Sequence, residues 1–295
     1  MNQIKLKAMA KINIGLDVVG RREDGYHEVR MIMQSIRLHD KLTISKTEKT
    51  GIRMETNLPY LPANENNLVY KAAKLLLDEF QIQQGVYIKL EKHIPVAAGM
   101  AGGSSDAAAT LIGINRMFSL GLSKQELMKR GVSLGADIPY CIMRGTALAE
   151  GIGEKLTRLP DFPDCHIVIA KPGISVSTKF VYGNLKLDEI EQHPDIDGML
   201  ADIEHKDLKS VTGKMSNVLE QVTIPEYPVI EDIKTVMKEQ GALNAMMSGS
   251  GPTVFGIFDD YQKAKNAYSV LKNGDLSRQT YLTGVFHNRR VKNDR

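Results

Sequence analysis

A loop rich in glycine and serine, followed at once by an alanine-rich stretch, most constrains what this chain can form. The segment reads PVAAGMAGGSSDAAATL over residues 95–111. Its glycines are Gly99, Gly102 and Gly103, and three residues typical of helix N-caps follow them: Ser104, Ser105 and Asp106. Glycine allows positive φ and a close approach of the backbone to a ligand. Because alanine favours helix, we expect a loop that leads into a helix after these caps.

Such a loop predicts an anion site. The first N–H groups of a helix lack intrahelical partners, and the helix dipole places about half a positive charge there, which suits phosphate. A plain turn between a strand and a buried helix is the alternative. The loop matches neither GxxxxGK[ST], since no lysine follows the glycines, nor GxGxxG. The two most common nucleotide loops are therefore excluded.

Composition indicates an ordinary globular protein. A length of 295 residues predicts two domains, and 42% hydrophobic with 25% charged residues is typical of soluble proteins. The net charge is only +3, and much of the excess lies in a C-terminal tail with Arg289, Arg290, Lys292 and Arg295. A short basic tail is more typical of a frayed terminus than of nucleic-acid binding, so we expect no nucleic-acid partner.

Cysteine usage and the N-terminus indicate the cytoplasm. Only Cys141 and Cys165 occur, which gives neither a disulfide framework nor a CxxC metal pair. The first 20 residues alternate polar and apolar side chains, and no run of 18 apolar residues exists. We expect a cytoplasmic protein without an export signal or a membrane span.

Hydrophobic periodicity predicts strands and helices in both halves of the chain. Expected strands in the first half are 3–9, 12–19, 28–38, 41–46, 86–90, the apolar run 138–143 and 146–149, with a turn at RREDG, 21–25. Expected helices there are 67–81 and 123–134, the second with a capping box of Ser123 and Glu126 and with Gly135 as its C′ residue. The second half predicts helices near 178–186, 197–220 and 228–240, and strands near 166–170, 244–247, 252–258 and 280–286. The LPDFP segment, 159–163, marks the expected boundary between domains 1–163 and 164–295 of an α+β protein.

A second glycine loop and a lysine–asparagine pair are further candidates for a binding site. MSGSGPT, 247–253, is a second glycine loop, which by itself is a turn; two such loops in different domains make sense if a ligand lies between them. In the segment AKIN, Lys11 and Asn13 are two residues apart and share one face of a strand. A solvated edge strand is the alternative for this pair.

Together these segments resemble a known family. AKINIGLDV, DGYHEV, PVAAGMAGGSSDAA, LGADIPY and MSGSGPT occur in the order and approximate spacing of the GHMP kinase superfamily, and the resemblance covers essentially the full chain. It implies a two-domain α+β fold with an N-terminal domain like ribosomal protein S5 domain 2 and a ferredoxin-like C-terminal domain. It also implies ATP-dependent phosphorylation of an alcohol. DGYH distinguishes the branch that phosphorylates methylerythritol linked to cytidine diphosphate, in the non-mevalonate route to isoprenoids, from homoserine, mevalonate and galactose kinases.

The resemblance implies two catalytic residues. Asp137 matches the general base that takes the proton of the acceptor hydroxyl, and Lys11 matches the lysine that keeps this carboxylate ionised. An opposite charge within ~4–6 Å lowers the pKa of an aspartate by ~1–3 units, so we expect the two side chains to lie close together. A turn aspartate that caps its own backbone before an apolar strand is the alternative for Asp137.

The resemblance also implies binding residues for both substrates. The expected ATP-binding residues are Pro95, Val96, Ala97, Ala98, Gly99, Met100, Ala101, Gly102, Gly103, Ser104 and Ser105. Mg²⁺ would bridge phosphate oxygens, and no acidic pair marks a dedicated metal cage. The expected acceptor contacts are Asn13, Tyr26, His27, Lys92, Thr178, Tyr182, Gly249 and Ser250, with Tyr26 and Tyr182 stacking on the cytosine and His27 bonding its edge.

Two departures from the family pattern stand in the glycine loop. Met100-Ala101 replaces the more frequent Leu-Gly, and Asp106 places a carboxylate beside an expected phosphate. Because like charges repel, we expect the Asp106 side chain to point away from the nucleotide.

Alternative functions fit the sequence less well. A serine hydrolase built on Ser105 or Ser248 lacks a GxSxG elbow. A nucleotide-binding regulator without turnover would have no need of Lys11 and Asp137. A GHMP kinase that acts on another alcohol stays open. The expected partners are small molecules only, with no membrane, and a homodimer is open.

Overall fold

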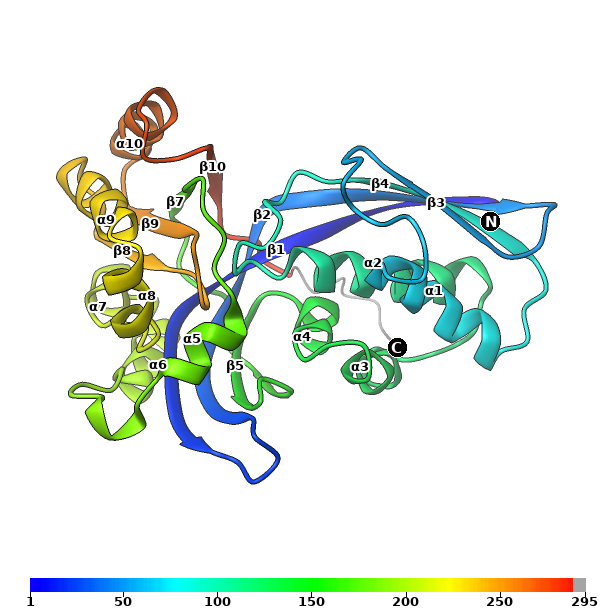
Figure 1. Cartoon of the computed structure of the whole chain (residues 1–295), viewed down its shortest axis with the longest axis horizontal. Helices are drawn as coiled ribbons and strands as arrows, with labels where there is room; N and C mark the ends of the chain where they lie inside the picture. The colour runs from blue at the N-terminus through cyan, green and yellow to red at the C-terminus, as the bar shows by residue number, and fades with distance from the viewer. Residues whose placement is uncertain (289–295) are drawn as a thin grey trace. The chain divides into compact units, whose positions relative to one another are not determined.

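The computed structural model describes residues 1–288, so the basic tail from Arg289 onward lies outside the described residues. The chain forms two compact units (Figure 1). The first unit contains Met1–Lys11 and Leu38–Met143, and the second contains Ile12–Arg37 and residues 144–288. Since neither unit is one continuous segment, the boundary after residue 163 stays a prediction. Among residues 1–288, no helix has both the length and the apolar character needed to cross a membrane.

Two long paired strands replace four predicted short ones. β1 runs over Gln3–Arg21 and β2 over His27–Thr47. Residues 8–18 of β1 are buried on both faces, so the alternation that marks a half-buried strand is lost there and the sequence shows a false break. The turn expected between the two strands is confirmed: the amide of Arg22 donates to the carbonyl of Tyr26 at 2.8 Å, and Gly25 has φ 85°.

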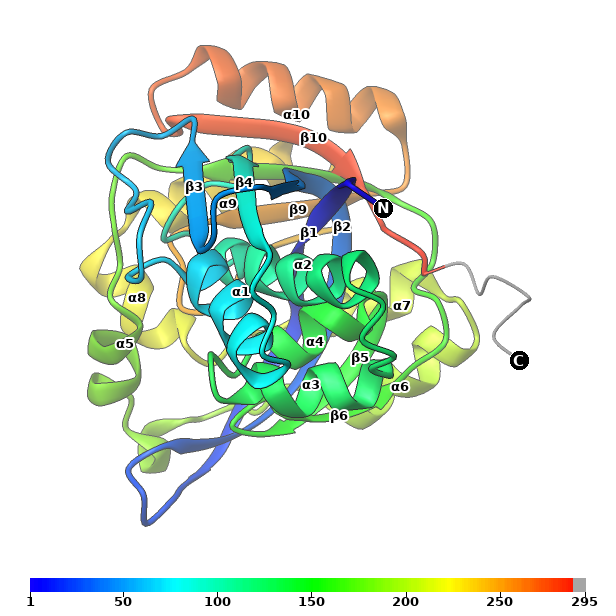
Figure 2. The ribbon, with the colours of Figure 1, turned by 90° about the vertical axis from the view of Figure 1, so that its right-hand side faces the viewer.

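The first unit places helices against strands of mixed direction. β4 (Gly85–Glu91) pairs antiparallel with residues 41–47 of β2 and parallel with β3 (Ile52–Thr56). The helices are α1 (Leu68–Glu79), α2 (Gly102–Met117), α3 (Lys124–Val132) and α4 (Ile138–Met143). α1 packs along α2, and both lie beside β3 and β4 (Figure 2). The core is aliphatic, with Leu76, Ile88 and Leu111 fully buried.

Helix ends in this unit follow local chemistry. Asn67 caps α1 by accepting from the Val69 amide at 2.9 Å, and the predicted Ser123–Glu126 capping box of α3 is confirmed. Gly135 is not the C′ residue, because α3 ends at Val132. The expected strand at 138–143 is also wrong: the run forms α4. An apolar run of six residues has no period that separates strand from buried helix.

The second unit contains a four-stranded antiparallel sheet in the order β10-β7-β9-β8. Its strands are β7 (His166–Lys171), β8 (Asn244–Met247), β9 (Val254–Phe258) and β10 (Gln279–Gly284). The helices that pack on it are α9 (Val229–Glu239) and α10 (Tyr261–Asn273); Figure 2 shows α10 lying along β10. β5 (Thr146–Gly151) pairs with residues 29–34 of β2 and with β6 (Lys155–Arg158).

The helix expected over 197–220 is divided. The segment forms α6 (Ile196–Glu204) and α7 (Leu208–Gly213), with α8 (Glu220–Glu226) after it and α5 (Thr178–Asn184) before it. Lys206 has φ 56°, which ends α6, and Asp207 caps α7 by accepting from the Ser210 amide at 3.0 Å. A short polar break therefore divides the single helix that hydrophobic periodicity predicts.

Candidate active site

The glycine loop joins β4 to α2, but the helix begins earlier than predicted. α2 starts at Gly102, and its N-cap is Ala101 at φ 53° with no side-chain capping bond. The expectation that Ser104, Ser105 and Asp106 cap the helix is therefore wrong, since all three lie inside it. The cap comes from a left-handed backbone conformation, which a side-chain rule does not detect.

Positive φ angles alternate along the loop. They occur at Ala97 (51°), Gly99 (69°) and Ala101 (53°). Alternation of this kind points successive backbone amides inward and is typical of anion-binding nests. Of the three glycines predicted to turn the chain, only Gly99 does so. Gly102 packs closely instead, because a Cβ there would lie 3.1 Å from Nζ of Lys92 and 3.2 Å from Cγ2 of Ile94.

The first turn of α2 supplies the amides expected at an anion site. Its first intrahelical bond runs from the Ser105 amide to the Ala101 carbonyl at 2.8 Å, so the amides of Gly102, Gly103 and Ser104 precede the helical ladder. The Ser105 hydroxyl is engaged elsewhere, since it donates to the Met9 carbonyl at 2.6 Å and is buried. Ser105 thus fastens the helix to β1 through its side chain.

A pocket of about 340 Å³ opens beside the loop, entirely within the first unit. Most loop residues line it, together with Lys92, Asp106 and a wall of Leu61, Pro62, Asn66, Asn67, Leu68 and Leu90. None of these wall residues was predicted to bind a substrate, because the proline and asparagine residues of 57–66 are typical of a connecting loop. Asn67 connects this loop to α1, because its Oδ1 accepts from the Val69 amide and its Nδ2 donates to the Pro62 carbonyl at 2.8 Å.

Both predicted catalytic residues belong to the unit that carries the glycine loop. Lys11, on β1, is buried with 5% of its surface exposed, and its amide donates to the Met100 carbonyl at 3.2 Å. Met100 itself is buried. Asp137 is half-buried directly before α4, where its carbonyl accepts from the Cys141 amide at 3.0 Å. Close approach of the Lys11 and Asp137 side chains stays a prediction.

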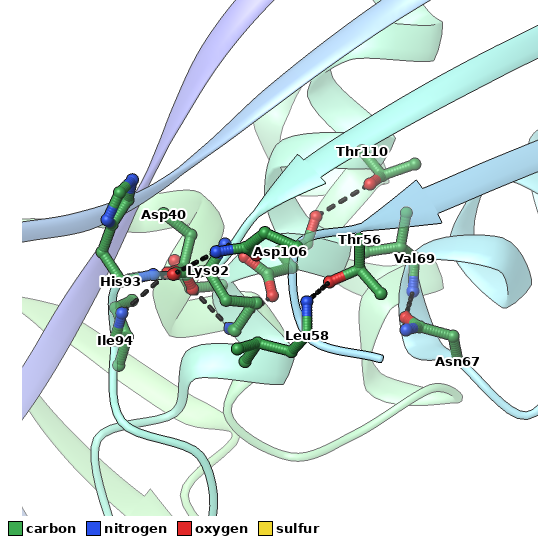
Figure 3. Close-up of polar contacts among 12 residues, drawn as sticks. Asp40, Thr56, Leu58, Asn67, Val69, Lys92, His93, Ile94, Asp106 and Thr110 are labelled. Atoms are coloured by element: carbon green, nitrogen blue, oxygen red, sulfur yellow. Dashed lines mark hydrogen bonds and ion pairs between the residues drawn. The ribbon is translucent and has the colours of Figure 1, made fainter. Parts of the chain in front are cut away.

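A buried ion cluster lies at the same pocket wall (Figure 3). Nζ of Lys92 contacts Oδ2 of Asp40 and lies 2.7 Å from Oδ2 of Asp106. Lys92, predicted as a substrate contact, therefore has its ammonium between two carboxylates. Asp106 is among the residues that line the pocket, and its buried carboxylate faces the Lys92 ammonium. Its orientation relative to the nucleotide stays a prediction. Desolvation raises the pKa of Asp106 well above its ordinary value, while Lys92 opposes the rise and Asp40 adds to it.

Two predicted acceptor residues meet in the second unit. The rings of His27 and Tyr182 have centroids 5.2 Å apart with planes tilted by 43°. Burial, and then the charge of Arg21, lowers the pKa of His27. Tyr26 is 60% exposed. Asn13 is fully buried, with Nδ2 3.1 Å from the sulfur of Met31.

The second glycine loop also lies in the second unit, between β8 and β9 as predicted. The Thr178 and Ser250 hydroxyls are 2.9 Å apart, which joins two expected acceptor contacts. Gly249 has φ 58°, and its carbonyl accepts at 2.8 Å from Nδ2 of Asn217, which also donates to the Met247 carbonyl. Asn217 was not predicted; its position in a helix-rich segment gave no signal of this role.

The chain matches two family models. GHMP kinases N terminal domain matches residues 67–145, and GHMP kinases C terminal matches residues 199–275. A solved homoserine kinase from Cytophaga hutchinsonii shares the fold, with a TM-score of 0.77 at 21% identity over 97% of this chain and 95% of that one. The predicted two-domain α+β GHMP fold is thus confirmed.

Relatives of higher identity narrow the family. The 4-diphosphocytidyl-2-C-methyl-D-erythritol kinase of Lachnoclostridium phytofermentans is 59% identical over 99% of this chain and 100% of its own length. That of Lachnospira eligens is 58% identical over 97% and 99%. A crystal structure of 4-(cytidine 5'-diphospho)-2C-methyl-D-erythritol kinase has a TM-score of 0.83 at 30% identity, over 96% and 100%. The chain therefore belongs to the GHMP kinases and, within them, to the family of 4-diphosphocytidyl-2-C-methyl-D-erythritol kinases.

Proposed function

We propose that this protein transfers the γ-phosphoryl group of ATP to the 2-hydroxyl of 4-diphosphocytidyl-2-C-methyl-D-erythritol in the non-mevalonate route to isoprenoid precursors. The products are the 2-phosphate and ADP. The observation that carries the acceptor is the contact between His27 and Tyr182, 5.2 Å apart, in a chain of this family. An aromatic face and a hydrogen-bonding edge beside it suit a nucleobase.

The glycine loop is the proposed site of the donor, Mg-ATP. The amides at the start of α2 and the alternating turn at Ala97, Gly99 and Ala101 suit phosphate oxygens. The apolar wall of the adjoining pocket, with Leu61 and Leu68, suits the base of the nucleotide. Mg²⁺ enters with the nucleotide, because it prefers phosphate oxygens and few protein ligands.

Asp137 and Lys11 carry the proposed chemistry. The Asp137 carboxylate accepts the proton of the acceptor hydroxyl while that oxygen forms a bond to the γ-phosphorus. The bond from the γ-phosphorus to the bridging oxygen breaks, and ADP leaves with the bonding electrons. The Lys11 ammonium offsets charge on the transferred group. Asn13, Thr178, Gly249 and Ser250 are proposed to orient the acceptor.

Location and assembly complete the proposal. We place the enzyme in the cytoplasm, supported by a chain with two cysteines, of which Cys141 is buried. Its partners are small molecules, ATP and the acceptor. A homodimer is the assembly that light scattering in solution would test.

The test is ADP release by the purified protein with Mg-ATP and each of three acceptors: 4-diphosphocytidyl-2-C-methyl-D-erythritol, homoserine and mevalonate. We expect turnover only with the first acceptor. Asp137→Asn should lower kcat by about 10²-fold or more, since general-base catalysis contributes about 10²–10⁴-fold. Asp78→Asn, the same change at an exposed carboxylate paired with Lys74, is the matched control.

Each result separates the donor from the acceptor. Turnover with homoserine or mevalonate, and none with the cytidine compound, would support kinase activity but refute the proposed acceptor. Full activity of Asp137→Asn would refute the general base while leaving the substrates standing.

A further inference from the structure

The Asp40–Lys92–Asp106 cluster is almost completely buried and is not used by the proposed chemistry. The side chains of Lys92, Asp40 and Asp106 expose 4%, 0% and 3% of their surfaces. Oδ1 of Asp106 is buried without a hydrogen-bond partner among residues 1–288. Burying three ionisable groups is costly, and an apolar trio of similar size often gives equal stability. A function of the cluster beyond stability is therefore worth seeking in its position.

The cluster holds the start of the glycine loop. Oδ1 of Asp40, on β2, accepts from the amides of His93 and Ile94, at 2.8 Å for Ile94 (Figure 3). These two residues directly precede Pro95, where the loop begins. Oδ2 of the same carboxylate contacts the Lys92 ammonium. Asp40 thus binds the backbone and the side chain of the segment that enters the loop.

The cluster holds the end of the loop as well. Nζ of Lys92 lies 2.7 Å from Oδ2 of Asp106, inside α2. The same ammonium lies where Gly102 begins the helix, close enough that a Cβ on Gly102 would be 3.1 Å away. Charge-assisted hydrogen bonds of this kind are strong and directional when desolvated. One lysine therefore connects the residues before the loop to the helix after it.

We propose that Asp40, Lys92 and Asp106 are positioning residues for ATP binding, which set the distance between the entry of the glycine loop and the first turn of α2. None of the three needs to contact phosphate for this role. The inference rests on the proposed use of the loop as the nucleotide site. It assigns Lys92 a role different from direct contact with substrate.

The experiment compares Asp40→Asn, Lys92→Met and their double variant in the full-length protein, with Asp78→Asn as control. Titration calorimetry with Mg-ATP gives Kd without acceptor, ADP release gives the acceptor KM, and thermal unfolding reports folding. We expect each single variant to raise the ATP Kd about tenfold or more and to change the acceptor KM less than about twofold. The ATP Kd of the double variant should be at most about twice that of the more strongly affected single variant, because both changes break the same connection.

Three outcomes would overturn the proposal: an ATP Kd unchanged in both single variants, fully additive effects in the double variant, or equal rises in ATP Kd and acceptor KM. If Asp40→Asn does not fold, Asn57→Ala replaces it. Asn57 accepts from the Lys92 amide at 2.7 Å and donates to its carbonyl at 3.1 Å, and its loss buries no unpaired charge. An ATP Kd unchanged in both Lys92→Met and Asn57→Ala would then overturn the proposal. Wild-type protein that binds ATP but does not phosphorylate the acceptor refutes the proposed acceptor, not the cluster.

Discussion

The amide of Lys11 donates a 3.2 Å hydrogen bond to the carbonyl of Met100, which joins the proposed catalytic strand directly to the glycine loop. A second bond, from the Ser105 hydroxyl to the Met9 carbonyl, fastens the same strand to α2 two residues earlier. Two hydrogen bonds therefore couple the backbone that carries Lys11 to the backbone proposed to hold phosphate. In phosphoryl transfer, where positioning supplies most of the catalysis, such coupling has direct consequences for rate.

Ser105→Ala should lower the free energy of unfolding by about 1–3 kcal/mol, because the buried Met9 carbonyl loses its donor. Denaturant unfolding measures this. Ser133→Ala is the matched control, since its exposed hydroxyl donates to the Arg130 carbonyl at 2.8 Å, and we expect a change within about 0.5 kcal/mol. Equal losses in the two variants would contradict a special role for the Ser105 bond.

Tyr182→Ala should raise the acceptor KM about tenfold, because stacking of a base on an aromatic ring contributes about 1–3 kcal/mol. Tyr182→Phe keeps the ring and should change KM by less than about threefold. The ATP KM of both variants serves as the internal reference. If Tyr182→Ala left the acceptor KM at the wild-type value, the ring would not stack on the cytosine.

The acceptor KM should depend on pH through His27. Burial, with a smaller effect of Arg21, lowers the pKa of His27 below its ordinary value of 6.5, so the ring is neutral at neutral pH. A neutral ring both donates and accepts a hydrogen bond, whereas the protonated ring only donates. We expect a constant KM from about pH 8 to about 6.5 and a rise at lower pH, as His27 protonates.

His27→Gln supplies the comparison, since its amide donates and accepts without titrating. Its KM should stay level across the same range while that of the wild type rises. The same rise in both proteins would assign the effect to another group.

Asp106→Asn should change how stability depends on pH. Desolvation, opposed by Lys92 and assisted by Asp40, raises the pKa of Asp106 well above 3.8. The folded state then binds more protons than the unfolded state, so this carboxyl lowers the free energy of unfolding as pH rises from its unfolded towards its folded pKa. The difference in unfolding free energy, variant minus wild type, should increase as pH rises from the unfolded pKa of about 3.8 towards the raised folded pKa. Urea unfolding at several pH values measures it, and a difference independent of pH would contradict the raised pKa.

Local patterns predicted the elements whose signals are local. Alternating residues marked β4, and Asn67 and Ser123 marked helix starts, because a capping side chain acts within three residues. β3 and β6 were missed, since both are short and β6 is mostly exposed and rich in charge. The order of motifs located Lys11, Asp137 and the glycine loop within one compact unit.

Other features could not be predicted, because they arise from contacts between distant segments. Asp40 looks like any polar residue on a strand, yet its carboxylate binds amides 53 and 54 residues away. The start of α2 at Gly102 depends on the backbone angle of Ala101, and no side-chain pattern marks it. Asn217 holds carbonyls of the second glycine loop 30 and 32 residues further along.

Ala97 and Ala101 hold left-handed backbone conformations that glycine would adopt more readily. For alanine this conformation is unfavourable by about 1–2 kcal/mol per residue. The folded protein holds it before nucleotide binds, so binding need not create it. An alanine also has fewer alternative backbone conformations than a glycine, so the empty loop samples fewer conformations. Such preorganisation lessens the conformational entropy lost on binding. The loop would then bind the triphosphate in a conformation that it already has when empty, without folding around the ligand.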